Sequence, residues 1–194
     1  MNRTSTDQST SVPVIDPFRY LKAFPAILTI IGLLSGPRTS SAAEKKTMET
    51  NGTIRVGQAA PPLAAVDING QEFSLESLKG RPVFIDFGSV ICEACADMVL
   101  EMNRLEKKYG GTDLKVVMIA DGAVPLEMTK AFFSRLKATF TVVRDEEWSF
   151  FIDYGVTIVP FKVLVDRDGM IRKMHLGYAP RVEKRMDFDE VLAR

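Results

Sequence analysis

The segment Val83-Phe-Ile-Asp-Phe-Gly-Ser-Val-Ile-Cys-Glu-Ala-Cys95 joins an apolar run to two cysteines three positions apart. The apolar run is typical of a strand that is buried on both faces of a parallel sheet. The stretch after the cysteines has a helical stripe of apolar side chains at Met98, Met102, Leu105 and Tyr109. A strand, a turn and a helix that opens at a C-x-x-C pair together predict an α/β fold with redox chemistry at the turn.

The cysteine pair predicts thiol–disulfide exchange. Free backbone N–H groups at a helix N-terminus stabilise a thiolate, so Cys92 is the expected nucleophile. Cys95, one turn later, is near enough to resolve a mixed disulfide. A zinc site needs four ligands, whereas the chain has two cysteines and one histidine, His175. We therefore expect no metal and no cofactor apart from a redox-active Cys92–Cys95 disulfide.

Asp86 is the one charged residue within the apolar run, on the same face of the strand as Phe84. A buried carboxylate is costly unless it is protonated or has a function. We expect Asp86 to exchange a proton with Cys95, directly or through water, and Asp86→Asn to slow exchange without lowering stability. A solvated Asp86 at an edge or loop remains the alternative.

Pro160 directly precedes the apolar run 161–165, which is a predicted strand. A proline that opens a strand can follow a cis peptide bond, although most X–Pro bonds are trans. A cis bond would turn the backbone of Val159 towards the cysteines, where it could pair with an extended substrate strand. The residues alone leave the isomer open.

The other patterns predict a mixed sheet in which strands alternate with helices. Asn69-Gly70 predicts a type I′ hairpin between strands 63–68 and 71–74. Asp166-Arg-Asp-Gly169 predicts a closing hairpin between strands 161–165 and 170–176. The remaining expectations are strands at 114–120 and 139–143 and helices at 125–138, 146–154 and 181–194.

The N-terminal region predicts export. An uncharged apolar stretch at 23–36 follows a polar segment with three basic residues, and small residues at 41–43 suit a signal peptidase. We expect a signal peptide or membrane anchor at 1–43, with 21–36 as the possible tether, a linker at 44–54 and one domain at 55–194. The domain would then face an extracytoplasmic, oxidising compartment, either the periplasm or the outer face of the cytoplasmic membrane. The net charge is zero, and the sequence has no basic run or basic face that would predict nucleic-acid binding.

From residue 56 to about residue 178 the chain resembles the extracytoplasmic thioredoxin-like proteins of the TlpA/ResA group. The resemblance rests on the cysteine pair, on the apolar run before it, and on these further segments: Val56-Gly-Gln-Ala-Ala-Pro61, Asn69-Gly70, Leu78-Lys-Gly80, Tyr154-Gly-Val156, Val159-Pro160 and Asp166–Gly169. It implies a thioredoxin fold with an N-terminal β-hairpin extension. It also implies that Pro160 is cis and faces the cysteines, and that Asp86 matches the buried aspartate of thioredoxin.

By the same resemblance the clients are exported cysteine-containing proteins, such as apocytochromes during cytochrome c maturation. A protein that reduces clients in an oxidising compartment needs a supply of electrons, most simply from a membrane dithiol carrier. Glu93 lies between the cysteines and opposes the positive helix end, which raises the pKa of the Cys92 thiol. The reduction potential should therefore be nearer the thioredoxin value of roughly −270 mV than the DsbA value of about −120 mV.

The chain departs from the TlpA/ResA pattern at four positions. Relatives usually carry tryptophan where this chain has Gly88 and Ile91, and often glutamate and proline where it has Met98 and Leu100. Two alternative functions stay open. One is a thiol peroxidase: Ser89 matches the hydroxyl position of such enzymes, but this chain has Ile85 where they carry a proline. The other is a dithiol copper carrier, for which this chain lacks a well-placed histidine.

Overall fold

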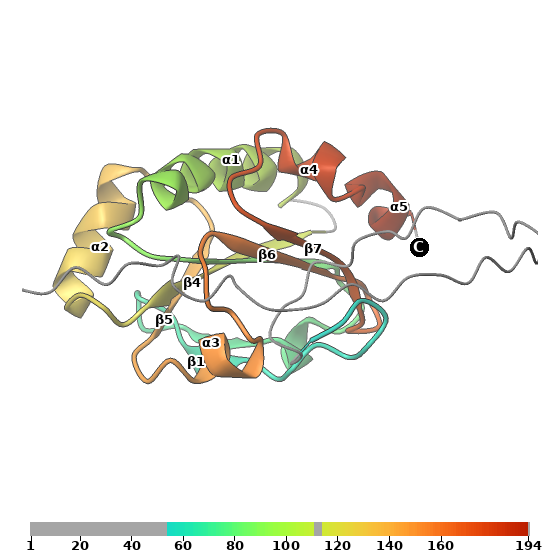
Figure 1. The fold of residues 1–194 in the computed structure, drawn as a ribbon, viewed down its shortest axis with the longest axis horizontal. Coiled ribbons are helices and arrows are strands. Elements are labelled where there is room, and N and C mark those ends of the chain that lie inside the picture. Colours follow the sequence, from blue (N-terminus) through green and yellow to red (C-terminus); the bar gives the residue numbers. More distant parts are fainter. Residues whose placement is uncertain (1–53, 111–113, 194) are drawn as a thin grey trace, which may run out of the picture. The chain divides into compact units, whose positions relative to one another are not determined.

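Five strands form a central mixed sheet in the order β5-β4-β3-β6-β7 (Figure 1). The computed structural model describes residues 54–110 and 114–193. Strands β3, β4 and β5 are parallel, and β6 and β7 are antiparallel to their neighbours. Their bounds are Val83–Gly88 (β3), Lys115–Asp121 (β4), Thr141–Asp145 (β5), Phe161–Val165 (β6) and Ile171–Leu176 (β7). The apolar run with Asp86 is thus the middle strand, as its continuous burial pattern predicts.

Helices cover both faces of this sheet, which confirms the predicted thioredoxin-like architecture. Figure 1 shows α1, α4 and α5 on one face and α3 with the β1 strand on the other. The bounds are Glu93–Tyr109 (α1), Leu126–Arg135 (α2), Ser149–Asp153 (α3), Val182–Arg185 (α4) and Phe188–Leu192 (α5). The N-terminal extension consists of β1 (Ala64–Val66), β2 (Glu72–Ser74) and the 3-10 helix η1 (Glu76–Leu78).

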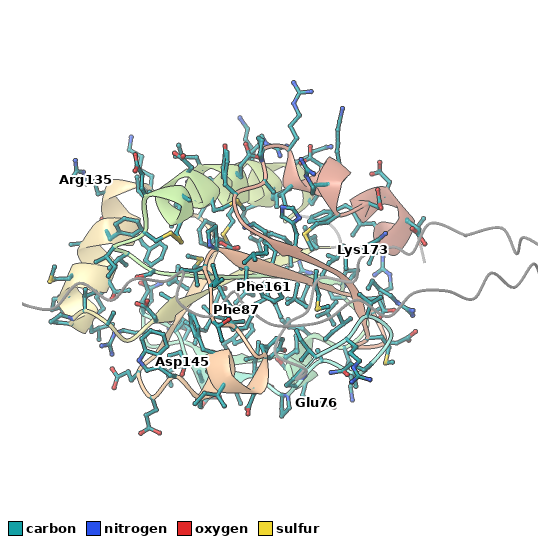
Figure 2. The ribbon with its side chains drawn as sticks, in the orientation of Figure 1. Glu76, Phe87, Arg135, Asp145, Phe161 and Lys173 are labelled. Atoms are coloured by element: carbon teal, nitrogen blue, oxygen red, sulfur yellow. A yellow bond between two sulfur atoms is a disulfide. The ribbon has the colours of Figure 1, made fainter. Side chains whose placement is uncertain are left out.

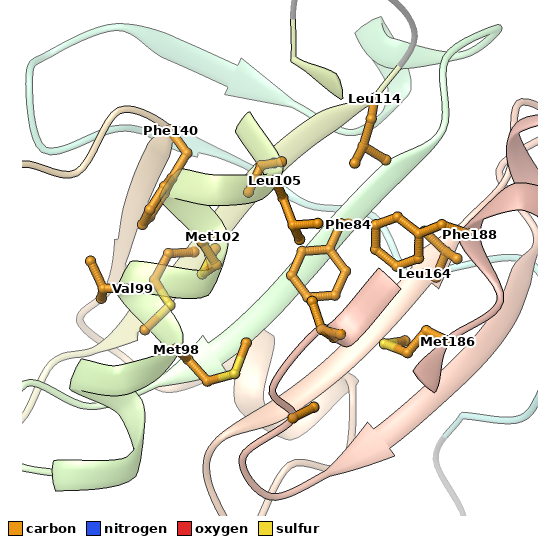
Figure 3. Close-up of a cluster of buried hydrophobic side chains, with 14 of the residues drawn as sticks. Phe84, Met98, Val99, Met102, Leu105, Leu114, Phe140, Leu164, Met186 and Phe188 are labelled. Carbon is orange, nitrogen blue, oxygen red and sulfur yellow. The ribbon is translucent and has the colours of Figure 1, made fainter. Parts of the chain in front are cut away.

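Two hydrophobic cores result, one on each face, because side chains alternate along a strand. Phe84 points into the α1-side core, where Figure 3 shows its ring among side chains of α1 and next to Phe188. Val83, Ile85 and Phe87 point into the α3-side core. Phe87 lies opposite Phe161 where β3 pairs with β6, as Figure 2 shows. Asp86 therefore shares the α1 side with Phe84, as predicted.

The N-terminal hairpin is present, but its predicted type I′ turn is wrong. Of the two central residues, only Gly70 has a positive φ, +84°, whereas a type I′ turn needs two. The Asp67 carboxylate accepts hydrogen bonds from the backbone N–H groups of Asn69 (2.8 Å) and Gln71 (2.9 Å). This arrangement stabilises a longer loop, and its tip bonds to the edge strand through Ile68 N–H and the Val142 carbonyl.

Two predicted helices are also corrected. The predicted helix 181–194 is two short helices, because Asp187 between them has a φ of +50°, which breaks the helical backbone. The predicted helix 146–154 begins only at Ser149. There the buried carboxylate of Asp145 accepts the N–H groups of Phe150 and Phe151 and so sets the first turn.

The predicted signal peptide or anchor at 1–43 and most of the predicted linker lie outside the described residues. Ile54, the last residue of that linker, is buried in the α3-side core, so it packs as part of the domain. Within 54–110 and 114–193, no helix combines the length and apolar character needed to cross a membrane.

Candidate active site

Cys92 and Cys95 form a disulfide at the N-terminus of α1, with their Cα atoms 5.2 Å apart. Cys92 is the N-cap residue, and its Sγ accepts a hydrogen bond from the Cys95 backbone N–H at 3.2 Å. A thiolate at Cys92 would accept the same hydrogen bond and lie in the positive potential of a helix of five turns. The local geometry thus suits Cys92 as the more acidic thiol of the reduced pair.

The two sulfur-bearing residues differ in exposure. Cys92 is half-buried, whereas Cys95 is 0% exposed beneath the first turn of α1. Only the first cysteine is therefore open to a partner molecule.

A short turn after β3 holds Cys92 in place. The Cys92 N–H donates to the Ser89 carbonyl at 3.3 Å, and the Ile91 N–H donates to Ser89 Oγ at 3.4 Å. Ser89 is buried, whereas Ile91 is 76% exposed beside the disulfide. The position where relatives usually carry tryptophan thus presents a smaller apolar side chain to solvent.

Gly88, the other position where relatives usually carry tryptophan, lies directly under Cys95. A Cβ atom on Gly88 would be 3.4 Å from both Cβ and Sγ of Cys95 and would collide with the end methyl of Met118. Met118, on β4, thus occupies the space that a side chain at residue 88 would need. This packing explains why glycine is accommodated where the family pattern has a large ring.

Asp86 is fully buried, two residues before Gly88 on the same face of β3. Residues two apart on one strand are separated by roughly 6–7 Å, and Gly88 packs against Cys95, so Asp86 lies on the Cys95 side of the sheet. Neither carboxylate oxygen accepts a hydrogen bond within the described part of the chain. Burial raises the pKa of Asp86 to about 6, although the nearby Lys162 acts to lower it.

Lys162 is the buried charged residue of this region that the sequence analysis did not single out. Its Nζ lies 3.3 Å from Asp86 Oδ1, and both side chains are 0% exposed. The two residues face each other across the antiparallel β3–β6 pair. The signal was present in the sequence, because Lys162 interrupts the apolar run of β6 just as Asp86 interrupts that of β3.

Pro160 and Val159 lie where β6 begins. The Val159–Pro160 peptide bond is cis. Pro160 is buried, and its carbonyl accepts the Gly177 N–H at 2.8 Å. Among the described residues, the backbone N–H and carbonyl of Val159 have no hydrogen-bond partner.

Glu93, the first residue of α1, is exposed next to Cys92.

Comparisons with known proteins agree with this geometry. The Redoxin family model matches residues 55–192. The thiol-disulfide oxidoreductase ResA of Geobacillus thermodenitrificans is 29% identical over 124 residues, covering 64% of this chain and 71% of the relative. The thioredoxin-like protein YneN of Bacillus subtilis is 27% identical over 142 residues, covering 70% and 81%.

Among solved structures, a thiol:disulfide interchange protein of Chlorobium tepidum, named DsbE, superposes with a TM-score of 0.65 at 25% identity. The superposition covers 71% of this chain and 99% of that one. The residues matched by the family model include Cys92, Cys95 and Pro160. This chain therefore belongs to the Redoxin family, among its thiol-disulfide oxidoreductases.

Proposed function

We propose that the protein reduces disulfides of exported client proteins, with apocytochromes as one client class. The observation that carries this proposal is the pairing of a half-exposed Cys92 with a fully buried Cys95 at a helix N-terminus. Such a pair can attack one client disulfide at a time and keep the second thiol out of solvent until it is needed.

The reaction moves two electrons from the protein to the client. The Cys92 thiolate attacks one sulfur of the client disulfide, that S–S bond breaks, and the other client sulfur leaves as a thiolate. Cys95 then gives its proton to Asp86 and attacks Cys92 Sγ. The mixed disulfide breaks, the client leaves as a dithiol after taking up protons, and the Cys92–Cys95 disulfide remains. A membrane dithiol would reduce it again.

The surface around Cys92 suits an extended client segment. The free backbone groups of Val159 can pair with such a segment as a short β-ladder. Ile91 and Ile158 are 76% and 62% exposed and can contact apolar side chains of the client. Backbone pairing is independent of client sequence, so it fits a protein with several clients.

The proposed site of action is extracytoplasmic, with residues 1–43 as export signal or anchor and 21–36 as the tether if uncleaved. An oxidising compartment supplies disulfide substrates. Cell fractionation, with N-terminal sequencing of the mature chain, tests this part. A mature cytoplasmic protein that retains residue 1 would contradict it.

Trapping tests the reaction itself. Cys95→Ala should accumulate mixed disulfides through Cys92 with a peptide that contains a disulfide, whereas Cys92→Ala should accumulate none. Wild-type reduced protein should reduce the same peptide stoichiometrically and consume hydrogen peroxide only slowly. Rapid peroxide consumption without mixed disulfides would support a thiol peroxidase instead.

A further inference from the structure

Lys162 occupies an unusual position for a lysine. It is the second residue of β6, two positions after Pro160, and its whole side chain is buried. Burying an ammonium group is costly unless it is paired and hydrogen-bonded. Its neighbours along the strand, Phe161 and Val163, are buried in the α3-side core, so Lys162 points to the opposite, α1 side.

Two contacts fix the ammonium group. Lys162 Nζ donates a hydrogen bond to the Gly177 carbonyl at 2.6 Å and lies 3.3 Å from Asp86 Oδ1. Gly177 is also bound through its N–H to the Pro160 carbonyl. The turn after β7, the strand that follows the cis-proline and the buried carboxylate are thus joined through one side chain.

The other groups that face this pair do not replace Lys162 as a counter-ion. On β4, the residue opposite Asp86 is Met118, and on α1 Cys95 packs against Gly88, two residues after Asp86. On β7, the residue opposite Lys162 is the half-buried His175. Burial, Lys162 and Arg185 of α4 together lower the pKa of His175, which disfavours a charged imidazole beside the pair.

We propose that Lys162 is a positioning residue of the exchange reaction, whose ammonium group holds Asp86 as a carboxylate on the Cys95 side of the sheet. The inference rests on the proposed role of Asp86 as acceptor of the Cys95 proton. An acceptor must be ionised before the thiol gives up its proton, and full burial opposes ionisation. The attraction of an ammonium group 3.3 Å away favours the ionised form.

The consequence is that the client-binding segment and the proton acceptor share one strand. Val159 and Pro160 begin the run whose next residues place Lys162 against Asp86. The charge that favours the ionised acceptor is therefore supplied by β6 and held by the hydrogen bond to the Gly177 carbonyl.

Lys162→Gln tests the charge specifically, because an amide can still donate to the Gly177 carbonyl. We would titrate the Asp86 carboxyl carbon by NMR in the oxidised full-length protein. The midpoint should rise by about one pH unit or more over wild type. Lys173→Met is the matched control, since Lys173 lies on β7 and pairs with the exposed Asp187. An Asp86 midpoint that is the same in Lys162→Gln and wild type overturns the inference.

Exchange kinetics provide the second measurement. In Lys162→Gln the acid limb of the rate–pH profile should move to higher pH by the same shift as the carboxyl titration. If Asp86→Asn slows exchange but Lys162→Gln leaves the profile unchanged, the Lys162 inference alone fails. If Asp86→Asn leaves the rate unchanged, the proposed role of Asp86 fails, and the inference fails with it.

The double variant Asp86→Asn/Lys162→Gln, which has no charge at either position, is the control for effects on folding. Should Lys162→Gln be too unstable to measure, Lys162→Met offers an apolar side chain that fits the α1-side core. The same shift in the Asp86 titration is expected there, and its absence contradicts the inference.

Discussion

Cys92 and Cys95 are three residues apart in sequence but belong to different environments. Cys92 caps a helix at the surface, and Cys95 is buried next to Gly88. After reduction, limiting iodoacetamide should modify Cys92 roughly tenfold or more faster than Cys95. Tandem mass spectrometry of quenched samples measures both rates, and unfolded protein, where both thiols are exposed, is the control. Faster labelling of Cys95 would reverse the assigned roles.

Glu93 adjusts the same site through its charge. A carboxylate next to Cys92 disfavours the thiolate, so Glu93→Gln should lower the pKa of the Cys92 thiol and raise the reduction potential. The change should be modest, because Glu93 is exposed and screened by salt. Redox titration against glutathione or dithiothreitol measures it. Asp97→Asn, an exposed change one turn further along α1, should have a smaller effect, and equal effects would contradict a local role of Glu93.

Asp86 links the site to pH-dependent stability. Its folded pKa of about 6 lies above the ordinary value of 3.8, so between these values the native state holds a proton that the unfolded state has lost. Stability should therefore fall as pH rises from about 4 to about 6, by on the order of 1–3 kcal/mol. Urea unfolding across this range measures it, with Asp86→Asn/Lys162→Met as the reference that lacks this dependence. An identical pH dependence in both proteins would contradict the assignment.

The ion pair also revises the expectation for Asp86→Asn alone. From the sequence, removal of a buried charge should leave stability unchanged or higher. In the structure the change strands the buried ammonium of Lys162, and removal of one partner of a buried pair typically costs about 3–5 kcal/mol. We now expect Asp86→Asn to lower the free energy of unfolding clearly at pH 7, and Asp86→Asn/Lys162→Met to recover the lost stability.

At the scale of elements, a half-buried ion cluster ties α1 to α4. Arg104 of α1 donates to Glu183 of α4 at 3.0 Å and to Glu101, one turn earlier, at 2.7 Å. Glu101 also accepts the Arg181 backbone N–H at the start of α4. The short helix α4 thus depends on α1 for polar contacts as well as for its buried Val182.

Arg104→Ala should lower the free energy of unfolding by about 1–2 kcal/mol, because two carboxylates that are largely shielded from water lose their partner. Lys79→Ala is the matched control. It removes an exposed pair with Glu76 and should cost about 0.5 kcal/mol or less. Denaturant titration compares them, and equal losses would mean that the cluster contributes nothing beyond a surface pair.

At the scale of the whole molecule, one sheet separates two cores, and β3, β4, β5 and β6 contribute side chains to both. Phe84 and Ile85 are neighbours on β3, yet they are buried on opposite faces. Trp148, the single tryptophan, makes an edge-on contact with Phe151 on the α3 side at 5.1 Å between ring centres. Fluorescence of Trp148 therefore reports on the face of the sheet opposite to Phe84.

Phe84→Ala should destabilise the domain by about 3–5 kcal/mol, because it leaves a cavity beneath α1 and α5. If the two cores unfold together, the Trp148 transition should move to lower denaturant by the same amount as the far-UV circular dichroism transition. An exposed change on the Trp148 side, such as Ile152→Ala, is the control. A Trp148 transition that stays at its wild-type midpoint in Phe84→Ala would show that the cores unfold separately.

The local sequence pattern was sufficient to predict much of this structure. The order of strands and helices, the disulfide at a strand-to-helix turn, the burial of Asp86 and the distribution of β3 side chains between two faces all follow from periodicity and spacing. These properties depend on residues close together in the chain, so the amino-acid sequence contains them directly.

Other properties needed the tertiary structure, because they depend on which distant residues meet. Lys162 becomes the partner of Asp86 only when β6 pairs with β3 in one register, and Met118 fills the space above Gly88 only when β4 lies alongside. The local sequence likewise did not determine the isomer of the Val159–Pro160 bond, the form of the loop at Asn69 or the helix break at Asp187. Contacts with the rest of the fold select among alternatives of similar local energy, and that selection is made by the assembled sheet and its two cores.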